Sequence, residues 1–232
     1  MTTATRPTST ANPLLRHGDR LSRDEFERRY EAMPDVKAEL LDGVVYMASP
    51  VSLNHARPHG LLMGWIVAYL VGTPGVDAGD NATTRLPLGS SEPQPDVYLR
   101  IDEAHGGQSR MDEDSYLAGS PELLGEVANS SLSYDRTIKK GIYQREGVRE
   151  YILWSVEEAT IIWYALFDGD YRALPADDEG IVRSGVFPGL WLDVESMARR
   201  DIGRVMRVLN RGLESPEHAQ FVEQLRRAPS AK

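Results

Sequence analysis

The chain has 232 residues, 41% hydrophobic and 26% charged, which suits one globular domain with a sizeable core. It contains no cysteine, which excludes disulfide bonds, zinc–thiolate sites and a cysteine nucleophile and fits a reducing cytoplasm. A net charge of −9 argues against a general nucleic-acid coat protein but not against a nuclease, whose metal site is itself acidic. The longest apolar run, Leu61 to Val71, is well short of the roughly 20 residues that span a bilayer, so we expect no membrane partner.

A polar tail and a short helix open the chain. The N-terminal stretch is rich in Thr, Ser and Pro and lacks the apolar segment of a secretory signal, so we expect residues 1–18 to form a disordered tail. Residues 22–33 predict an amphipathic helix, because Ser22 and Glu25 have the spacing of a capping box and Pro34 ends the pattern.

A β-hairpin is predicted next, over residues 36–47. Asp42-Gly43 stands between two apolar runs, and this dipeptide favours the type I′ turn that joins antiparallel strands. Glu39 lies on the first strand, on the same face as Leu41.

Residues 53–71 predict a long helix with a continuous apolar stripe. His55 and His59 stand four residues apart near its start, a spacing that could ligate zinc. Pro58 disturbs this turn, however, and neither the glutamate of the metalloprotease pattern nor a third ligand is evident. We therefore expect satisfied or exposed histidines rather than a zinc site.

Two strands and a loop follow this helix. Residues 83–88 predict a strand, and Pro95 to Ile101 predict another in which Asp96 shares a face with Arg100. Asp102 to Gly119 is polar and contains glycine, which predicts a long, mobile loop over a site.

The rest of the chain is organised around Pro121 to Asn129, which predicts a buried strand. Glu126 shares one face of it with Leu124 and Ala128. A carboxylate in so apolar a strand is unfavourable unless it has a partner. A divalent metal, a buried cation from the next helix, or a purely structural ion pair could each be that partner.

The helix predicted over residues 134–146 carries two candidate cations, and helical spacing separates their directions. Ile138 and Ile142 are four residues apart and should face the core together. Lys139 and Tyr143 form the adjacent stripe, so Lys139 can lean towards the strand, where carboxylates would hold it charged. Lys140 lies a further step round, with more access to solvent or to a phosphate.

The C-terminal part predicts strands rich in Ile, Trp and Tyr, the first two forming an antiparallel hairpin, and then charge-rich amphipathic helices. The segments, in order, are strands at 149–156, 160–167, 170–174 and 180–185, an apolar edge at 187–193, and helical regions at 196–213 and 217–227.

Three carboxylates on predicted strands, Glu39, Asp96 and Glu126, and a lysine on the following helix make a possible phosphodiesterase site. We expect the three carboxylates to stand on adjacent strands and to lie within a few ångströms of one point. Mg²⁺ takes hard oxygen ligands, and a nearby lysine can orient the attacking water and stabilise charge on phosphorus. The spacing alone is weakly specific. Glu39 could be a cross-strand polar residue, Asp96 could cap a loop, and Lys139 could lie on the helix surface.

Four motifs occur in a fixed order along the chain. They are Glu39-Leu40-Leu41-Asp42-Gly43, Pro95-Asp96-Val97, Glu126-Val127, and a helix pattern that runs from Asp135 through Lys139 and Tyr143 to Gly147 and Tyr151. In this order they resemble the Uma-type family of putative restriction endonucleases, within the PD-(D/E)XK nuclease superfamily. The resemblance extends over residues 21–194, most of the chain.

The resemblance implies particular roles. Asp96 matches the superfamily's Pro-Asp aspartate, Glu126 the acidic residue of the second half-motif, and Glu39 the acidic residue of the N-terminal element. The commonest superfamily pattern has a lysine where this chain has Ala128, whereas Lys139 matches the helix position that carries it in the Uma-type variant. Implied metal ligands are thus Glu39, Asp96 and Glu126, and implied catalytic residues are Asp96, Glu126 and Lys139.

The same resemblance implies an α/β fold with a restriction-endonuclease-like core, a mixed central β-sheet flanked by helices, with an N-terminal β-hairpin and C-terminal helices. We expect this domain at residues 19–195 and a helical extension at 196–232. The implied activity is Mg²⁺-dependent hydrolysis of DNA, with Mn²⁺ as a substitute. We expect a cytoplasmic homodimer, because two symmetry-related sites can cut both strands of a duplex. Its expected contact surfaces are the strands at 149–167 and the final helices.

Two rival hypotheses remain. A binding or interaction module could retain the fold without catalysis, since fold does not fix function, and the acidic net charge suits that reading. A metal-dependent hydrolase could act instead on a small phosphate ester. In all three readings Tyr143 and Tyr151 are expected to pack in the core, and His55 has no assigned role.

Overall fold

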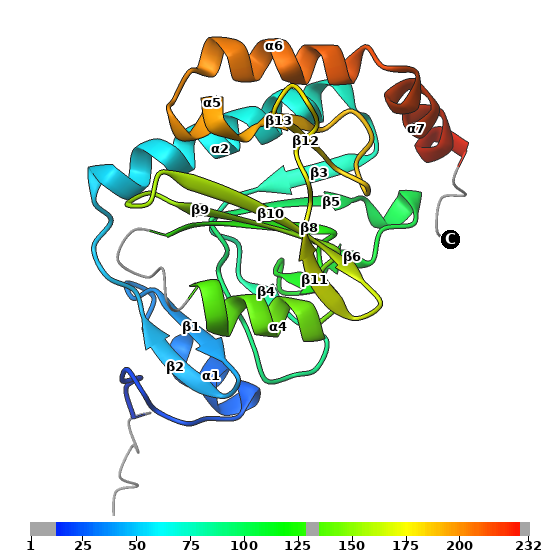
Figure 1. Cartoon of the computed structure of the whole chain (residues 1–232). Coiled ribbons are helices and arrows are strands. Elements are labelled where there is room, and N and C mark those ends of the chain that lie inside the picture. Colours follow the sequence, from blue (N-terminus) through cyan, green and yellow to red (C-terminus); the bar gives the residue numbers. More distant parts are fainter. Residues whose placement is uncertain (1–12, 129–134, 228–232) are drawn as a thin grey trace, which may run out of the picture.

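The computed structural model describes residues 13–128 and 135–227. At its centre is a mixed six-stranded sheet in the order β11-β10-β9-β8-β5-β3, in which β8 and β9 run parallel and the other neighbouring strands antiparallel (Figure 1). The strands of this sheet are β3 (Val76–Gly79), β5 (Val97–Ile101), β8 (Leu123–Ala128), β9 (Glu150–Ser155), β10 (Thr160–Phe167) and β11 (Asp170–Ala173). The predicted mixed central sheet is confirmed.

Helices cover both faces of the sheet. The helices α2 (Leu53–Gly72), α5 (Val194–Ala198) and α6 (Ile202–Leu213) lie above it in Figure 1, and α4 (Lys140–Arg145) lies below. Helix α7 (Pro216–Arg227) packs beside α6. Within the described parts of the chain, no helix is both long and apolar enough to cross a membrane.

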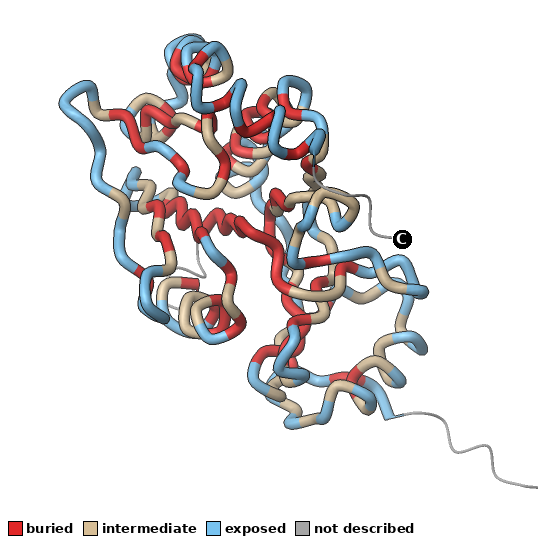
Figure 2. The backbone as a smooth tube through the Cα atoms, turned by 90° about the vertical axis from the view of Figure 1, so that its right-hand side faces the viewer, coloured by how far each residue is buried: buried red, intermediate tan, exposed pale blue. Residues whose placement is uncertain are grey.

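Side chains of β8 divide the core into two clusters, as the alternation in the sequence predicts. Leu123 and Val127 pack with Trp65 of α2, whereas Leu124 and Ala128 pack with residues of α4. Both β8 and β9 are buried at every residue, and Figure 2 shows buried backbone running through the middle of the molecule. Because residues alternate, Glu126 is directed to the α4 side.

The N-terminal elements form a separate unit beside α4 (Figure 1). It consists of α1 (Arg23–Tyr30) and the antiparallel strands β1 (Ala38–Leu41) and β2 (Val44–Met47). Asp42 and Gly43 both have positive φ, 48° and 74°, which confirms the predicted type I′ turn. The described structure begins within the expected tail, so residues 1–12 of that prediction lie outside it.

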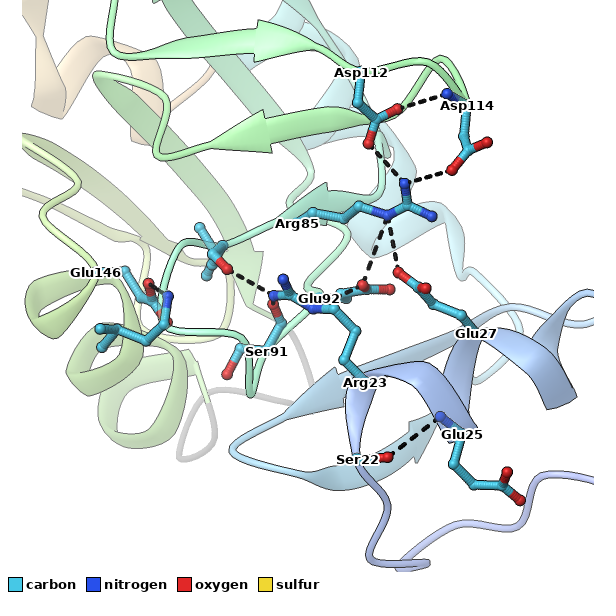
Figure 3. Close-up of polar contacts among 12 residues, drawn as sticks. Ser22, Arg23, Glu25, Glu27, Arg85, Ser91, Glu92, Asp112, Asp114 and Glu146 are labelled. Carbon is cyan, nitrogen blue, oxygen red and sulfur yellow. Dashed lines mark hydrogen bonds and ion pairs between the residues drawn. The ribbon is translucent and has the colours of Figure 1, made fainter.

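Ion pairs fasten this unit to the segment that leads into β5 (Figure 3). Arg23 of α1 donates to the carbonyl oxygens of Leu86 and Ser91 at 2.7 and 2.8 Å, and its Nε lies 3.0 Å from Glu92 Oε1. Main-chain hydrogen bonds also join Glu92 to Leu40 of β1. The hairpin is thereby held at a fixed place beside the central sheet.

A salt-bridge cluster around Arg85 extends this attachment (Figure 3). Arg85 lies in β4 (Thr84–Arg85), where its Nε is 2.9 Å from Glu27 of α1 and its Nη1 is 2.7 Å from Asp112. The strand predicted at 83–88 is shorter than expected, because β4 is only two residues long.

The prediction of a mobile loop from Asp102 to Gly119 is wrong. This segment contains a short 3₁₀ helix, η1 (Glu103–His105), and the strands β6 (Ser109–Met111) and β7 (Leu117–Gly119). Strand β7 pairs with both β4 and β6 and so completes a three-stranded sheet. Asp112 accepts hydrogen bonds from the N–H groups of Asp114 and Tyr116. The polar residues of this segment therefore form a tight turn rather than an open loop.

Two further C-terminal expectations need correction. The strand predicted at 180–185 is β12 (Ile181–Arg183), which does not join the strands at 149–174 but pairs with β13 (Trp191–Asp193) in a separate two-stranded sheet. The helical region at 196–213 is broken between α5 and α6, where Arg200 takes a φ of 64° and Asp201 caps the new helix. Val205 of α6 and Phe221 of α7 share the core cluster of the central sheet; residues 228–232 lie outside the description.

Candidate active site

A cavity of about 440 Å³ opens between the β1–β2 hairpin, the start of α2 and the neighbouring ends of β5 and β8. All four predicted site residues line it. The acidic, basic and histidine residues of its lining are His17, Lys37, Glu39, His55, Asp96, Glu126, Asp135 and Lys139.

Glu126 lies at the floor of this cavity with 3% of its surface exposed. Its Oε1 accepts a hydrogen bond of 3.0 Å from Lys139 Nζ and one of 2.7 Å from the Tyr143 hydroxyl. The stripe of Lys139 and Tyr143 predicted on the helix therefore does converge on this carboxylate.

Lys139 links two carboxylates that come from different sheets. Its Nζ lies 2.9 Å from Glu39 Oε1 and 3.0 Å from Glu126 Oε1, with Asp135 at 3.9 Å. Lys139 is 5% exposed, so the alternative interpretation, in which it lies on the helix surface, is wrong.

A widened helical turn places Lys139. Residues Asp135–Lys139 form a π-helical turn that leads directly into α4, and both of its end residues are buried. Ile138 is 36% exposed, so the prediction that it faces the core with Ile142 is wrong. A π turn uses i→i+5 hydrogen bonds, which shifts each residue from the direction that regular helical spacing assumes.

Glu39 reaches the cavity from the hairpin, so the expectation that all three carboxylates stand on adjacent strands is wrong for this residue. Its Oε1 accepts a 2.6 Å hydrogen bond from the main-chain N–H of Gln94. The Gln94 side chain in turn donates to the Tyr30 hydroxyl and to Thr83, each at 3.0 Å. Glu39 is therefore oriented by a surrounding network rather than free.

Asp96 stands immediately before β5 and beside Glu126. The antiparallel register pairs Val97 with Gly125. Asp96, one residue before Val97, therefore lies opposite Glu126, one residue after Gly125. Asp96 Oδ2 accepts a 2.7 Å hydrogen bond from Val127 N–H, and Oδ1 lies 3.1 Å from His55 Nε2.

The electrostatics of the lysine and its partners are coupled. Burial alone would lower the pKa of Lys139, but the carboxylates of Glu126, Glu39 and Asp135 outweigh it and raise that pKa well above its ordinary value. Burial raises the pKa of Glu126 well above its ordinary value, and the neighbouring carboxylates of Asp96, Asp135 and Glu39 add to this against the attraction of Lys139. The cavity thus holds more negative charge than Lys139 alone balances.

Asp96 behaves differently because of its imidazole partner. Burial would raise the pKa of Asp96, but the hydrogen bond with His55 and the N–H of Val127 bring that pKa below its ordinary value. The same hydrogen bond raises the pKa of His55. Asp96 is therefore ionised at neutral pH and available as an oxygen ligand.

Lys140 takes no part in this cavity. Its ammonium lies 3.9 Å from the centroid of the Tyr164 ring, and burial lowers its pKa. The lining residues of the cavity do not include it, so the reading of Lys140 as phosphate-facing receives no support from this geometry.

Sequence reasoning missed three participants. Asp135, named from the sequence only as the first residue of the helix motif, is 3% exposed and lies near Lys139. Tyr143 packs in the core as expected but also donates to Glu126. His55 pairs with Asp96, 41 positions later, which no local pattern reveals.

A mixed α/β sheet whose buried carboxylates and lysine meet in one cavity defines a protein of the nuclease-like α/β class. The family model described as "Uma2: Putative restriction endonuclease" matches residues 23–195, and the chain belongs to this family. A solved structure, described as a putative nuclease belonging to DUF820 from Anabaena variabilis ATCC 29413, is similar with a TM-score of 0.56. The similarity covers 82% of this chain and 99% of that one at 14% sequence identity, so it concerns the fold. No curated protein matches the chain.

Proposed function

We propose that this protein is a Mg²⁺-dependent endonuclease that hydrolyses phosphodiester bonds of DNA, with Mn²⁺ as a substitute. The observation that carries the proposal is the bridging of Glu126 and Glu39 by the buried Lys139 ammonium, beside Asp96, in an open cavity. Membership of the putative restriction endonuclease family supports the nuclease class.

The donor set fits a hard divalent cation. Glu39, Asp96 and Glu126 offer carboxylate oxygens, the ligands that Mg²⁺ takes together with water and phosphate oxygens. Since these carboxylates and Asp135 surround one lysine, a cation has excess negative charge to neutralise. A bound Mg²⁺ would lower the pKa of a coordinated water and polarise the scissile phosphate.

The chain's own residues then have distinct tasks. Lys139, held charged by its carboxylate neighbours, orients the attacking water and stabilises the negative charge that develops on phosphorus. Tyr143 fixes the Glu126 carboxyl through its hydroxyl, and the N–H of Gln94 fixes Glu39. These contacts reduce the rotamer freedom of the acidic residues before substrate arrives.

The first test is cleavage of plasmid and linear duplex DNA in the presence of Mg²⁺ or Mn²⁺. Lys139→Ala should abolish cleavage while leaving metal binding by calorimetry largely intact, because the three carboxylates remain. Lys140→Ala is the matched control, since Lys140 lies on the Tyr164 ring outside the cavity. Equal cleavage by both variants and the parent would contradict the assignment of Lys139.

The non-catalytic module remains the second candidate, because the net charge of −9 does not favour a phosphate-binding surface. Three carboxylates converging near DNA bring no advantage to a pure binding module, which favours the enzyme. Calorimetry separates the two: no binding of Mg²⁺ or Mn²⁺ at millimolar concentration would favour the module. If a small phosphate ester is hydrolysed instead, duplex DNA should fail to compete with it.

We propose further that the protein acts as a homodimer, with the exposed residues of β10 and the final helices as contact surfaces. The expected contribution of residues 150–155 is wrong, because β9 is buried inside the sheet at every residue. Two symmetry-related cavities would cut both strands of a duplex, and closed two-fold dimers are the commonest oligomers. Light scattering at tens of micromolar protein should give twice the mass of one chain. A monomer there would contradict the proposal.

A further inference from the structure

We propose that His55, His59 and Asp96 form a second cation site, selective for a transition metal ion such as Co²⁺ or Zn²⁺. This site would share Asp96 with the carboxylate cluster but recruit nitrogen ligands from α2. It goes beyond the proposed nuclease activity, because metal binding here is measurable whether or not DNA is cleaved.

The placement of the two histidines follows from the helix. His55 and His59 are four residues apart near the start of α2, so they lie one turn apart on one face. Their ring centroids are 5.7 Å apart. The candidate ligand atoms of the two histidines and Asp96 all lie within 4.8 Å of one another. Ligand atoms around a tetrahedral ion are about 3.4 Å apart, so the rings must turn to bring the ligand atoms together around an ion.

Both imidazoles point their Nε2 atoms at Asp96. His55 Nε2 is 3.1 Å from Asp96 Oδ1, and His59 Nε2 is 2.8 Å from the Asp96 carbonyl oxygen. Because Val127 N–H occupies Oδ2, the Oδ1 atom is the one directed towards the histidines. Asp80, whose Oδ2 is 3.6 Å from His59 Nε2, stands at the edge as a further oxygen donor.

The two histidines are partly buried. Their side chains are 23% and 15% exposed, and His55 lines the cavity, which gives an ion an entry path to this side of Asp96. The contacts of both rings with Asp96 hold them close to it.

The chemistry of the donors decides which metal fits. Two imidazoles and one carboxylate form a mixed nitrogen and oxygen set with open positions, which suits Zn²⁺ and its transition-metal neighbours. Mg²⁺ strongly prefers oxygen ligands and would favour Glu126 and Glu39 instead. The two sides of Asp96 therefore differ in selectivity, and a cation on the histidine side would replace the direct contact between His55 and Asp96.

A competing explanation is that the histidines only position Asp96 through hydrogen bonds. The two explanations differ in what a glutamine at position 55 would do. Glutamine retains an N–H donor for the Asp96 carboxylate but is a poor ligand for a transition metal. His55→Gln should therefore preserve a positioning role and lose a ligating role.

The experiment is a Co²⁺ titration of the full chain, followed by visible absorption and by equilibrium dialysis, in the absence of DNA. The parent should bind Co²⁺ with the absorption bands of nitrogen ligation. His55→Ala, His59→Ala and His55→Gln should each lose these bands and weaken binding by at least about tenfold. His17→Ala is the matched control, because His17 also lines the cavity but packs against Tyr46 outside the cluster.

Glu126→Gln separates this proposal from the nuclease proposal. It removes an implied Mg²⁺ ligand yet leaves all three members of the histidine site, so the Co²⁺ bands should persist. The proposal is overturned if the parent shows no nitrogen-ligated Co²⁺ or if His55→Gln binds Co²⁺ like the parent. It is also overturned if His17→Ala loses as much Co²⁺ affinity as His55→Ala and His59→Ala do. Thermal unfolding of each variant in EDTA checks that the fold is retained.

Discussion

At the scale of single residues, the feature that governs the cavity is one ammonium group among several carboxylates. Lys139 is buried and lies within 4 Å of carboxylates from Glu39, Glu126 and Asp135. Removing one member of a buried ion pair leaves uncompensated charge, which is far more destabilising than losing packing contacts alone. Lys139 therefore stabilises these carboxylates in the cation-free protein.

Replacement of Lys139 by methionine tests this stabilising role. Lys139→Met should reduce the free energy of unfolding in EDTA by about 3 to 5 kcal/mol near neutral pH, because the buried Glu126 and Asp135 and the partly buried Glu39 lose their cation. The loss should be smaller at acidic pH, where those carboxyl groups take up protons and no longer need a cation. Urea unfolding at the two pH values measures both effects.

The matched control is Lys140→Met. The Lys140 ammonium lies over the Tyr164 ring, and such a contact contributes about 0.5 to 1 kcal/mol at an exposed site. Its effect should not change between the two pH values. An equal, pH-independent loss for both lysines would show that Lys139 contributes packing only.

The sequence was sufficient to predict Glu39, Asp96, Glu126 and Lys139 as one cluster, because family motifs and strand alternation mark each of them. It was not sufficient for His55, because its partner Asp96 is brought near only when α2 packs on β5 and β8. Roles that depend on tertiary placement leave no periodic signal in the chain.

At the scale of elements, the sequence predicted helix and strand types better than their local geometry. The turn from Asp135 to Lys139 was expected to be regular, and the observed π turn exposes Ile138 and buries Lys139. The spacing of the apolar residues predicts a buried Ile138 and a more exposed Lys139. The ion pairs of Lys139 therefore contribute more to stability here than the burial of one isoleucine would. π turns occur frequently at functional sites, which agrees with this position in the cavity.

The packing of α6 on the core provides a test with a control on the same helix. A methyl group at Gly212 would lie 2.9 Å from Trp191 Cγ and closer still to the main-chain oxygen of Gly189. Gly212→Ala should therefore lower the free energy of unfolding by about 1 to 3 kcal/mol, the usual effect of overpacking.

Gly203→Ala is the control for that substitution. A methyl group at the exposed Gly203 would make only ordinary contact, 3.4 Å from Arg207 Nη1. Alanine favours helix by up to about 1 kcal/mol over glycine, so this variant should be as stable as the parent or slightly more stable. Chemical unfolding that ranks the two variants the other way would contradict the packing of α6.

The attachment of the hairpin unit depends on a buried carboxyl group whose pKa is shifted. Burial, together with the neighbouring carboxyl of Glu27, raises the pKa of Glu92 to about 8, against the attraction of Arg23 and Arg85. In the unfolded chain the group ionises at its ordinary pKa of 4.5. Between these pH values the folded state retains a proton that the unfolded state has released, so this group lowers stability as pH rises through that window.

Glu92→Gln cannot ionise and should remove this contribution. The variant should therefore lose less stability than the parent when urea unfolding is compared at about pH 5.5 and about pH 8.5. Glu25→Gln is the control with the same charge change on α1. Hydrogen bonds from Arg28 and Arg29 lower the pKa of Glu25, so its contribution changes only below that window. Parallel pH curves for parent and Glu92→Gln would contradict the shifted pKa.

At the scale of the whole molecule, charge opposes the proposed substrate. The net charge is −9, and the cavity adds a local excess of carboxylates over its buried lysine. DNA is a polyanion, and binding it requires local positive charge on the protein. A bound divalent cation would convert the cavity from repulsive to attractive for a phosphate, so binding of DNA and metal should be coupled.

This coupling predicts that DNA binding depends on metal even when cleavage does not occur. Fluorescence anisotropy of a labelled duplex should show at least about tenfold tighter binding in Ca²⁺ than in EDTA, which corresponds to about 1.4 kcal/mol. Asp96→Asn removes a carboxylate that is ionised at neutral pH, so it should bind better than the parent in EDTA and gain less from Ca²⁺. Glu179→Gln is the control, because Glu179 loses the same charge but pairs with Arg211 at the surface, away from the cavity. If the parent bound duplex DNA equally well in EDTA and in Ca²⁺, the cavity would not be where phosphate and metal meet.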